Sequence, residues 1–215
     1  MTANVNETPA RNGGLKVVGV IPARYGSKRF EGKVLASIGG KPMVQHVWEN
    51  AQKAKLLNEL IVATEDKRVA DACARFGARA VLTSPDHASG TDRLAEIAAN
   101  NNADLFVNIQ GDEPMVHPDM IDRLVEPFLR DKELKVATLI TKIETKEELD
   151  SPNVVKVVAD KNGMALYFSR SVIPFDRDGQ GGEGDAKSKK AMSIYYRHLG
   201  LYAYRRDFLL LFPGL

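Results

Sequence analysis

Strand-like and helix-like patterns of apolar residues alternate along the chain up to about residue 130. The continuous apolar run at 16–21 predicts a strand buried on both faces, because a half-exposed strand would alternate apolar and polar side chains. The run at 42–54 instead repeats apolar residues with a helical period and has Pro42 in its first turn. By the same reasoning we expect strands at 60–63, 80–82 and 105–109 and helices at 66–76, 91–99 and 118–130. Strands that alternate with helices predict a parallel sheet with right-handed crossovers.

The pattern becomes strand-rich after about residue 135. Strand character recurs at 136–140, 154–158, 165–168 and 198–204, and only 146–149 is helical. A mixed sheet, or an excursion from the main sheet, would accommodate these strands. We therefore expect an α/β fold: a Rossmann-like, mostly parallel sheet flanked by helices, with a strand-rich extension. The Gly-rich and charged stretch at 175–192 predicts a mobile loop.

Length, charge and cysteine content restrict the class of protein. The 215 residues fit a loose polar tail at 1–14 followed by a single domain at 15–215. The net charge of +2 gives no electrostatic case for nucleic-acid or membrane binding, and no apolar run is long enough to span a bilayer. The single Cys73 excludes an internal disulfide, and the tail lacks the apolar centre of a signal peptide. We therefore expect a cytoplasmic protein with no nucleic-acid partner and no membrane insertion.

A loop rich in cations follows the first predicted strand. It is broken by Gly26 and Gly32, and its basic residues are Arg24, Lys28, Arg29 and Lys33. Such a loop can wrap several negative oxygens, because glycine lets the backbone come close and the cations neutralise the charge. It is not a Walker P-loop, since five residues separate the two glycines and Val34 stands where a Ser or Thr would hold magnesium.

A carboxylate follows another predicted buried strand. The stretch FVNIQGDEP places Asp112 just beyond that strand, where it could hold a divalent cation. In open parallel sheets, ligands bind outside the carboxyl ends of the strands. The basic loop and Asp112 therefore predict together a site for a nucleoside triphosphate.

Two further segments have the composition of ligand-binding loops. The stretch DHASGTDR carries a helix-start signal at Ser89 or Thr91, and the N-terminus of a helix offers free N–H groups to a ligand as well as a cap. GQGGEG, at 179–184, has the spacing of a dinucleotide loop but follows no predicted strand, so we dismiss it. The histidines, including His87, His117 and His198, lack metal-ligand spacing, which argues against a zinc site.

Several runs, taken in order, resemble one enzyme family. The runs are IPARYGSKRFEGK, LTSPDHASGTDRLAE, VNIQGDEP, VVKVV, ALYFSR, IPFDRD and YRHLGLYAYRRDFL. Together they closely resemble the 3-deoxy-manno-octulosonate cytidylyltransferases, or CMP-KDO synthetases, from about residue 16 to the end. The resemblance implies a fold of the nucleotide-diphospho-sugar transferase type. It also implies that CMP passes from CTP to 3-deoxy-D-manno-octulosonate (KDO), releasing pyrophosphate and giving CMP-KDO for lipopolysaccharide biosynthesis.

The resemblance also implies roles for individual residues. Residues 15–133 would form the CTP-binding part, and 134–215 the part for sugar binding and dimerisation. Arg24 and Lys33 would be catalytic, and Asp112 would be catalytic and ligate Mg2+. The implied substrate-binding residues are Ser27, Ser89, Gly90, Thr91, Arg93, Gln110, Arg170, His198 and Tyr202. Ser27 would join the cations on the triphosphate, and Arg170 suits a carboxylate because its guanidinium can bind two oxygens. A homodimer is expected.

The chain departs from the family pattern in places. Glu31 and Val34 stand where the family loop usually has Pro, and Glu31 brings a negative charge near the phosphates. The family's later G-x-D-T-P-E-D-L motif, whose first Asp is a second metal ligand, has no copy here, which suggests a truncated or weakened enzyme. Two alternatives stay open: a cytidylyltransferase for another sugar acid, such as 8-amino-KDO or sialic acid, and a non-catalytic CTP-binding relative. No strong general base is evident, so we expect metal-assisted deprotonation of the acidic anomeric hydroxyl.

Overall fold

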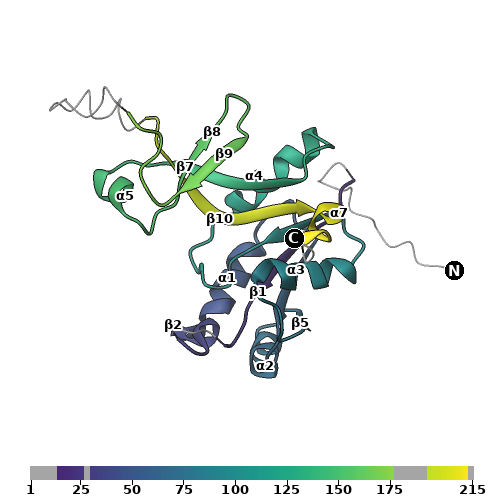
Figure 1. Cartoon of the computed structure of the whole chain (residues 1–215). Helices are drawn as coiled ribbons and strands as arrows, with labels where there is room; N and C mark the ends of the chain where they lie inside the picture. Colours follow the sequence, from purple (N-terminus) through teal and green to yellow (C-terminus); the bar gives the residue numbers. More distant parts are fainter. Residues whose placement is uncertain (1–13, 27–29, 177–192, 213–215) are drawn as a thin grey trace. The chain divides into compact units, whose positions relative to one another are not determined.

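The computed structural model describes residues 14–26, 30–176 and 193–212, which fall into two compact units (Figure 1). The first unit contains the residues up to Ala137 and those from Leu201 onward. The second unit is Thr138–Gly200. The tail expected at 1–14 and the loop expected at 175–192 lie almost wholly outside the described residues.

The first unit contains a sheet whose core is parallel. Strand β1 (Val17–Pro22) pairs in parallel with β4 (Glu59–Thr64) on one side and with β6 (Leu105–Asn108) on the other. Strand β5 (Ala80–Leu82) lies parallel to β4, and the end of β10 (Tyr196–Arg205) pairs antiparallel with β6. This mixed sheet with a parallel core confirms the predicted α/β class.

Helices flank this sheet. They are α1 (Met43–Ala51), α2 (Lys67–Arg75), α3 (Gly90–Ala99), α4 (Pro118–Arg130) and the short α7 (Arg206–Leu209). Helix α3 packs on β1, β4, β6 and α7, and its core contains Val20, Leu94, Phe106 and Leu209. Helix α1 packs on β1 and β4 and contacts α4. Burial of apolar side chains beneath these helices holds the strand ends in place.

A short hairpin in the first unit was missed by the sequence reasoning. Lys33–Leu35 forms a 3₁₀ helix, η1, and β2 (Ser37–Ile38) then pairs with β3 (Lys41–Pro42). The turn between the two strands is Gly39-Gly40, with φ of +57° and +85°, which glycine adopts without strain. Pro42 therefore ends a strand, and α1 begins one residue later than predicted.

The second unit is rich in strands, as predicted. It contains most of β7 (Val136–Lys142), then α5 (Lys146–Asp150), β8 (Lys156–Ala159), β9 (Ala165–Ser169) and the start of β10. Strand β8 pairs antiparallel with both β9 and β10, and β7 pairs with β10. A small core forms from Ile143, Leu149 and Tyr195, with Val154 against it.

The core beneath α3 can be tested through Phe106, which is fully buried. We expect Phe106→Ala to lower the free energy of unfolding by about 3–5 kcal/mol, because it removes apolar contacts and leaves a cavity. Urea denaturation followed by circular dichroism measures the change. The control is Phe175→Ala, which should change stability little, since Phe175 is 77% exposed. A loss below about 1 kcal/mol for Phe106→Ala would contradict this description of the core.

Candidate functional site

A cavity of about 540 Å³ lies in the first unit, at the carboxyl ends of β1 and β6. Its size is in the range of small-molecule sites. The lining residues are Pro22, Arg24, Phe30, Lys33, Val34, His87, Ala88, Ser89, Gly90, Arg93, Gln110, Gly111 and Asp112. The cavity thus brings together seven of the residues predicted for the site: Arg24, Lys33, Ser89, Gly90, Arg93, Gln110 and Asp112.

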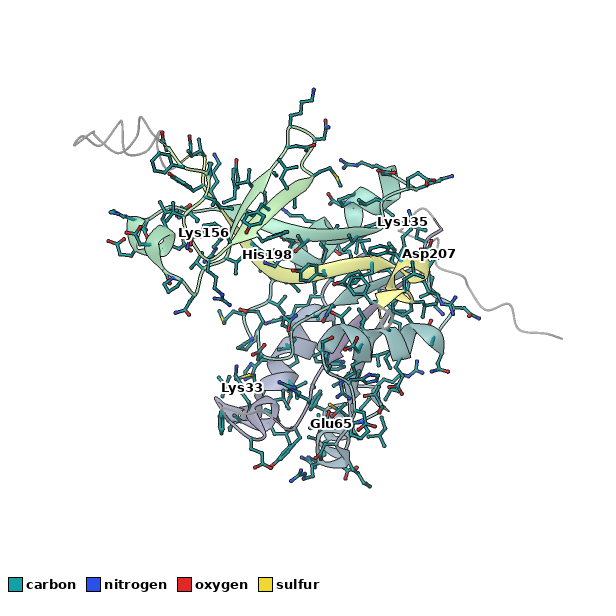
Figure 2. The ribbon with its side chains drawn as sticks, viewed as in Figure 1. Lys33, Glu65, Lys135, Lys156, His198 and Asp207 are labelled. Carbon is teal, nitrogen blue, oxygen red and sulfur yellow. The ribbon has the colours of Figure 1, made fainter. Side chains whose placement is uncertain are left out.

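An ion pair joins the predicted phosphate-binding loop to the predicted metal ligand. Lys33 Nζ lies 2.8 Å from Asp112 Oδ2 (Lys33 is labelled in Figure 2). The side chains are 39% and 51% exposed, so solvent screens the pair, and it is worth about 0–1 kcal/mol. A ligand can therefore separate the two groups at little cost. Lys33 is then available to an anion, and Asp112 to a cation.

Gly111 permits the close approach that builds this site. A Cβ atom on Gly111 would lie 2.6 Å from the carbonyl oxygen of Pro22, which is backbone and cannot swing away. Any larger residue would push the segment after β6 away from the end of β1. Gly111 was not among the residues predicted for the site, although its position between a buried strand and an acidic residue was a usable signal.

The start of α3 forms another wall of the cavity. Ser89 caps the helix: its Oγ accepts from Asp92 N at 3.2 Å, while Ser89 N donates to Asp92 Oδ2 at 2.9 Å. Ser89 and Gly90 line the cavity, so the helix N-terminus, which favours anions, faces it. Thr91 is not among the lining residues, and its side chain is hydrogen-bonded to Tyr204.

Arg93 belongs to the cavity wall but is engaged within the protein. Its side chain is 4% exposed, and Nη2 lies 3.0 Å from Glu65 Oε2, an ion pair without hydrogen-bond alignment. Nη1 donates to Thr83 Oγ1. Glu65 (Figure 2) also accepts from Tyr25 N at 2.8 Å. Arg93 therefore anchors, through Glu65, the segment that carries Arg24.

His87 and Glu96 stabilise the loop before α3, which the sequence reasoning did not foresee. His87 lines the cavity, and its Nε2 is hydrogen-bonded to Glu96 Oε2. The same oxygen accepts from Ser84 N at 2.9 Å. Burial acts to raise the pKa of Glu96, but the hydrogen bonds from His87 and Ser84 outweigh it and hold that pKa below its usual value. Glu96 stays charged and fixes both ends of this short loop.

The remaining predicted residues lie elsewhere. Tyr202 is in the first unit, on β10 opposite Asn108, stacked on Tyr204 with ring centroids 5.9 Å apart, and burial raises its pKa. Arg170 and His198 belong to the second unit. Ser27 lies outside the described residues.

His198 is placed as a neutral group. Its Nε2 is 2.8 Å from Thr138 Oγ1, and its ring lies edge-on to Phe168. Burial lowers the pKa of His198, so the imidazole is uncharged at neutral pH. Arg170, just after β9, is exposed, and its Nη1 donates to the carbonyl of Pro152 at 2.7 Å.

Comparisons with known proteins agree on one enzyme family. The model of the cytidylyltransferase family matches residues 18–213. The chain is 53% identical over 198 residues to the 3-deoxy-manno-octulosonate cytidylyltransferase of Geotalea uraniireducens, covering 92% of this chain and 79% of that protein. It is 50% identical over 200 residues to that of Solibacter usitatus, covering 93% and 75%. The chain belongs to the 3-deoxy-manno-octulosonate cytidylyltransferase family.

A solved structure of this family supports the fold. The structure of CMP:2-keto-3-deoxy-manno-octonic acid synthetase complexed with CTP superposes with a TM-score of 0.84 at 45% identity, covering 93% of this chain and 78% of that one. A cytidylyltransferase from Leptospira borgpetersenii, at 16% identity and a TM-score of 0.58 (coverage 94% and 65%), shares the fold. The predicted family, fold and enzyme class are thus confirmed.

The cytidylyltransferase cavity offers one carboxylate to a metal. Among the described residues, no group of three or more His, Cys, Asp or Glu side chains could hold an ion. Asp112 alone still fits Mg2+, which is commonly bound through one or two carboxylates with the remaining positions filled by water and substrate phosphates. No helix in the described part of this cytidylyltransferase is both long and apolar enough to cross a bilayer.

The close approach at Gly111 gives a direct test of the cavity. We expect Gly111→Ala to weaken CTP binding about 10-fold and to lower stability by roughly 1–3 kcal/mol, because its Cβ would push against the Pro22 carbonyl. Isothermal titration calorimetry and urea unfolding measure the two effects. Gly200→Ala is the control, since a Cβ there meets no atom of the described structure within 4 Å. Unchanged CTP affinity in Gly111→Ala would separate this contact from nucleotide binding.

Proposed function

We propose that this chain transfers CMP from CTP to KDO, giving CMP-KDO and pyrophosphate for lipopolysaccharide biosynthesis. The observation that carries the proposal is the cavity in which Arg24 and Lys33 lie with Asp112 at the ends of neighbouring parallel strands. This combination suits a triphosphate that carries Mg2+, because the cations bind phosphate oxygens and the carboxylate binds the metal. The identity of 53% to a 3-deoxy-manno-octulosonate cytidylyltransferase selects the nucleotide and the acceptor.

Phosphoryl transfer depends mainly on positioning and on charge stabilisation, and these residues supply both. Arg24 and Lys33 bind the triphosphate. A cation about 4 Å from an oxyanion contributes about 4 kcal/mol at an effective dielectric constant near 20, before desolvation is subtracted. Asp112 holds Mg2+, which when bound neutralises charge on the phosphate oxygens. The N-terminus of α3 at Ser89 and Gly90 faces the nucleotide, and Gln110 lies on the same wall.

The acceptor is bound through its acid group. Arg170 binds the carboxylate of KDO, because a guanidinium forms two parallel hydrogen bonds to a carboxylate. His198, whose Nε2 is hydrogen-bonded to Thr138, orients the sugar. Mg2+ held by Asp112 would lower the pKa of the anomeric hydroxyl, whose proton would pass to water.

We further propose a cytoplasmic homodimer. Strand β9 is apolar yet exposed: Leu166 and Tyr167 are each 65% exposed, and Phe168 is 41% exposed. Such an apolar surface in the second unit suits contact with a second copy of the chain. CTP and the buried free Cys73 are both compatible with the reducing cytoplasm.

Pyrophosphate release from CTP with Mg2+ tests the reaction. We expect turnover with KDO, and we expect Lys33→Ala and Asp112→Ala each to lower it by about 10²–10³-fold, as for loss of a charge-stabilising group. Lys41→Ala is the control, because Lys41 pairs with Glu49 outside the cavity. A variant with wild-type turnover would remove that residue from the mechanism.

The choice of acceptor separates the proposal from its alternatives. The same assay is run with 8-amino-KDO and with sialic acid in place of KDO. Faster turnover with either of these would reassign the acceptor. Tight binding of CTP and Mg2+ without pyrophosphate release would support a non-catalytic CTP-binding protein.

The ion pair between Lys33 and Asp112 predicts that removing the Asp112 carboxylate strengthens CTP binding when no metal is present. In EDTA, we expect Asp112→Asn to strengthen CTP binding by roughly 3- to 10-fold, because it removes a negative charge from the cavity and frees Lys33. With Mg2+, the same variant should bind CTP more weakly. Isothermal titration calorimetry measures both affinities.

A double variant identifies the origin of the gain. In a Lys33→Met background, the gain from Asp112→Asn in EDTA should shrink, because no lysine remains to be released. An undiminished gain would mean that the carboxylate only repels the nucleotide. Weaker CTP binding by Asp112→Asn in EDTA would contradict the idea that the two side chains are exchangeable partners.

A further inference from the structure

The second unit contains a lysine that is completely buried. Lys156, on β8 and labelled in Figure 2, is 0% exposed. Its Nζ donates to three backbone carbonyls. The acceptors are Ser151 at 2.8 Å, Val154 at 3.0 Å and Arg170 at 2.8 Å. An ammonium group has three donors, so all of them are satisfied. In the described part of the chain, no carboxylate forms an ion pair with Lys156.

Burying the charge of Lys156 lowers the stability of the second unit, because the ammonium group loses its hydration. Burial lowers the pKa of Lys156, and the nearby charge of Asp150 opposes that effect. Lysine is almost never fully buried unless it is paired, and an apolar side chain of similar size would fill the space without desolvating a charge. The three carbonyls come from separate places: the end of α5, the turn before β8 and the residue after β9. The ammonium therefore adds a shared contact to segments that strand pairing and backbone hydrogen bonds already bring together.

The register of the strands shows what Lys156 organises. Lys156 lies opposite Ser169 on β9 and opposite Arg197 on β10. The next residue along each of these strands is a predicted contact of the sugar acid, Arg170 in one case and His198 in the other. His198 N also donates to the carbonyl of Val155 at 2.8 Å. Lys156 thus lies between the two segments that carry the acceptor-binding residues.

Arg170 makes two hydrogen bonds to the segment that runs from Ser151 to Lys156. Its carbonyl accepts from Lys156, and its guanidinium donates to the carbonyl of Pro152, which lies between Ser151 and Val154. We propose that Lys156 is a positioning residue for the acceptor: it fixes the Arg170 backbone and the loop that orients the Arg170 guanidinium toward the carboxylate of the sugar acid. This inference rests on the proposed function, since it assumes the acceptor role of Arg170.

The kinetic test uses Lys156→Met, which keeps the apolar stem and removes the charge and its three hydrogen bonds. The expected result assigns to Arg170 a contact that binds the acceptor carboxylate equally in the ground state and the transition state, and loss of such a contact raises KM and leaves kcat. We expect KM for KDO to rise about 10-fold or more, with KM for CTP and kcat within about 2-fold. Lys161→Met, an exposed lysine in the turn after β8, is the matched control and should match wild type. Equal increases in both KM values, or none, would overturn the proposal.

A double-variant cycle tests whether Lys156 acts through Arg170. Arg170→Met should raise KM for KDO at least as much as Lys156→Met. Adding Lys156→Met to Arg170→Met should then change KM for KDO by less than about 2-fold, because the group that Lys156 positions is already gone. Multiplicative effects of the two substitutions would show that Lys156 acts independently, which contradicts the proposal.

Two further measurements cover failure of folding and failure of the proposed function. If Lys156→Met does not fold, Lys156→Gln keeps donors and should show a smaller rise in KM for KDO. No rise in KM for KDO overturns the proposal.

If wild type does not use KDO, the proposed function fails. The position of Arg170 is then measured by tryptic cleavage after Arg170, mapped by mass spectrometry. Faster cleavage there in Lys156→Met, but not in Lys161→Met, supports the positioning, and unchanged cleavage refutes it.

Discussion

The close approach of two strand ends in the first unit determines the site. Parallel β1 and β6 pair in register, with Val20 opposite Asn108, so the chain leaves both strands at the same edge of the sheet. Gly111 then allows its backbone to lie against the Pro22 carbonyl. Arg24 and Asp112, which follow these strands, therefore border one cavity. Lys33 and the N-terminus of α3 complete the lining of this cavity, whose position is set by the contact between Gly111 and Pro22.

Much of the fold could be predicted from periodicity, because buried parallel strands and amphipathic helices have different periods. The bounds of β5 and α4 agree with the prediction, and the other predicted strands and helices lie within a few residues of the observed ones. The hairpin of β2 and β3 was missed, because strands of two residues are too short to show a period. Pro42 was assigned to a first helical turn, since Pro is favoured there, but the backbone uses it to pair with Ser37.

The site was predictable where it depended on strand ends and was not where it depended on tertiary contacts. Cations and an acid that follow buried strands are visible in the sequence. Which residues of α3 face the cavity is not: Ser89 and Gly90 line it, while Thr91, a step of about 100° further round the helix, bonds to Tyr204. The bond between His87 and Glu96 links a loop to a helix, and histidine spacing alone carries no signal for it.

The pairing of Arg93 with Glu65 constrains how this cavity can evolve. Arg93 is 4% exposed and Glu65 17% exposed, and Glu65 also anchors the backbone of Tyr25, next to Arg24. Replacing one member alone would strand a charge in a dry environment and loosen the segment that bears a substrate-facing cation. A single substitution at either position is therefore unfavourable, even though neither side chain has to touch a reactant. The structure therefore makes the residue tolerated at position 65 depend on the residue at position 93, and the reverse.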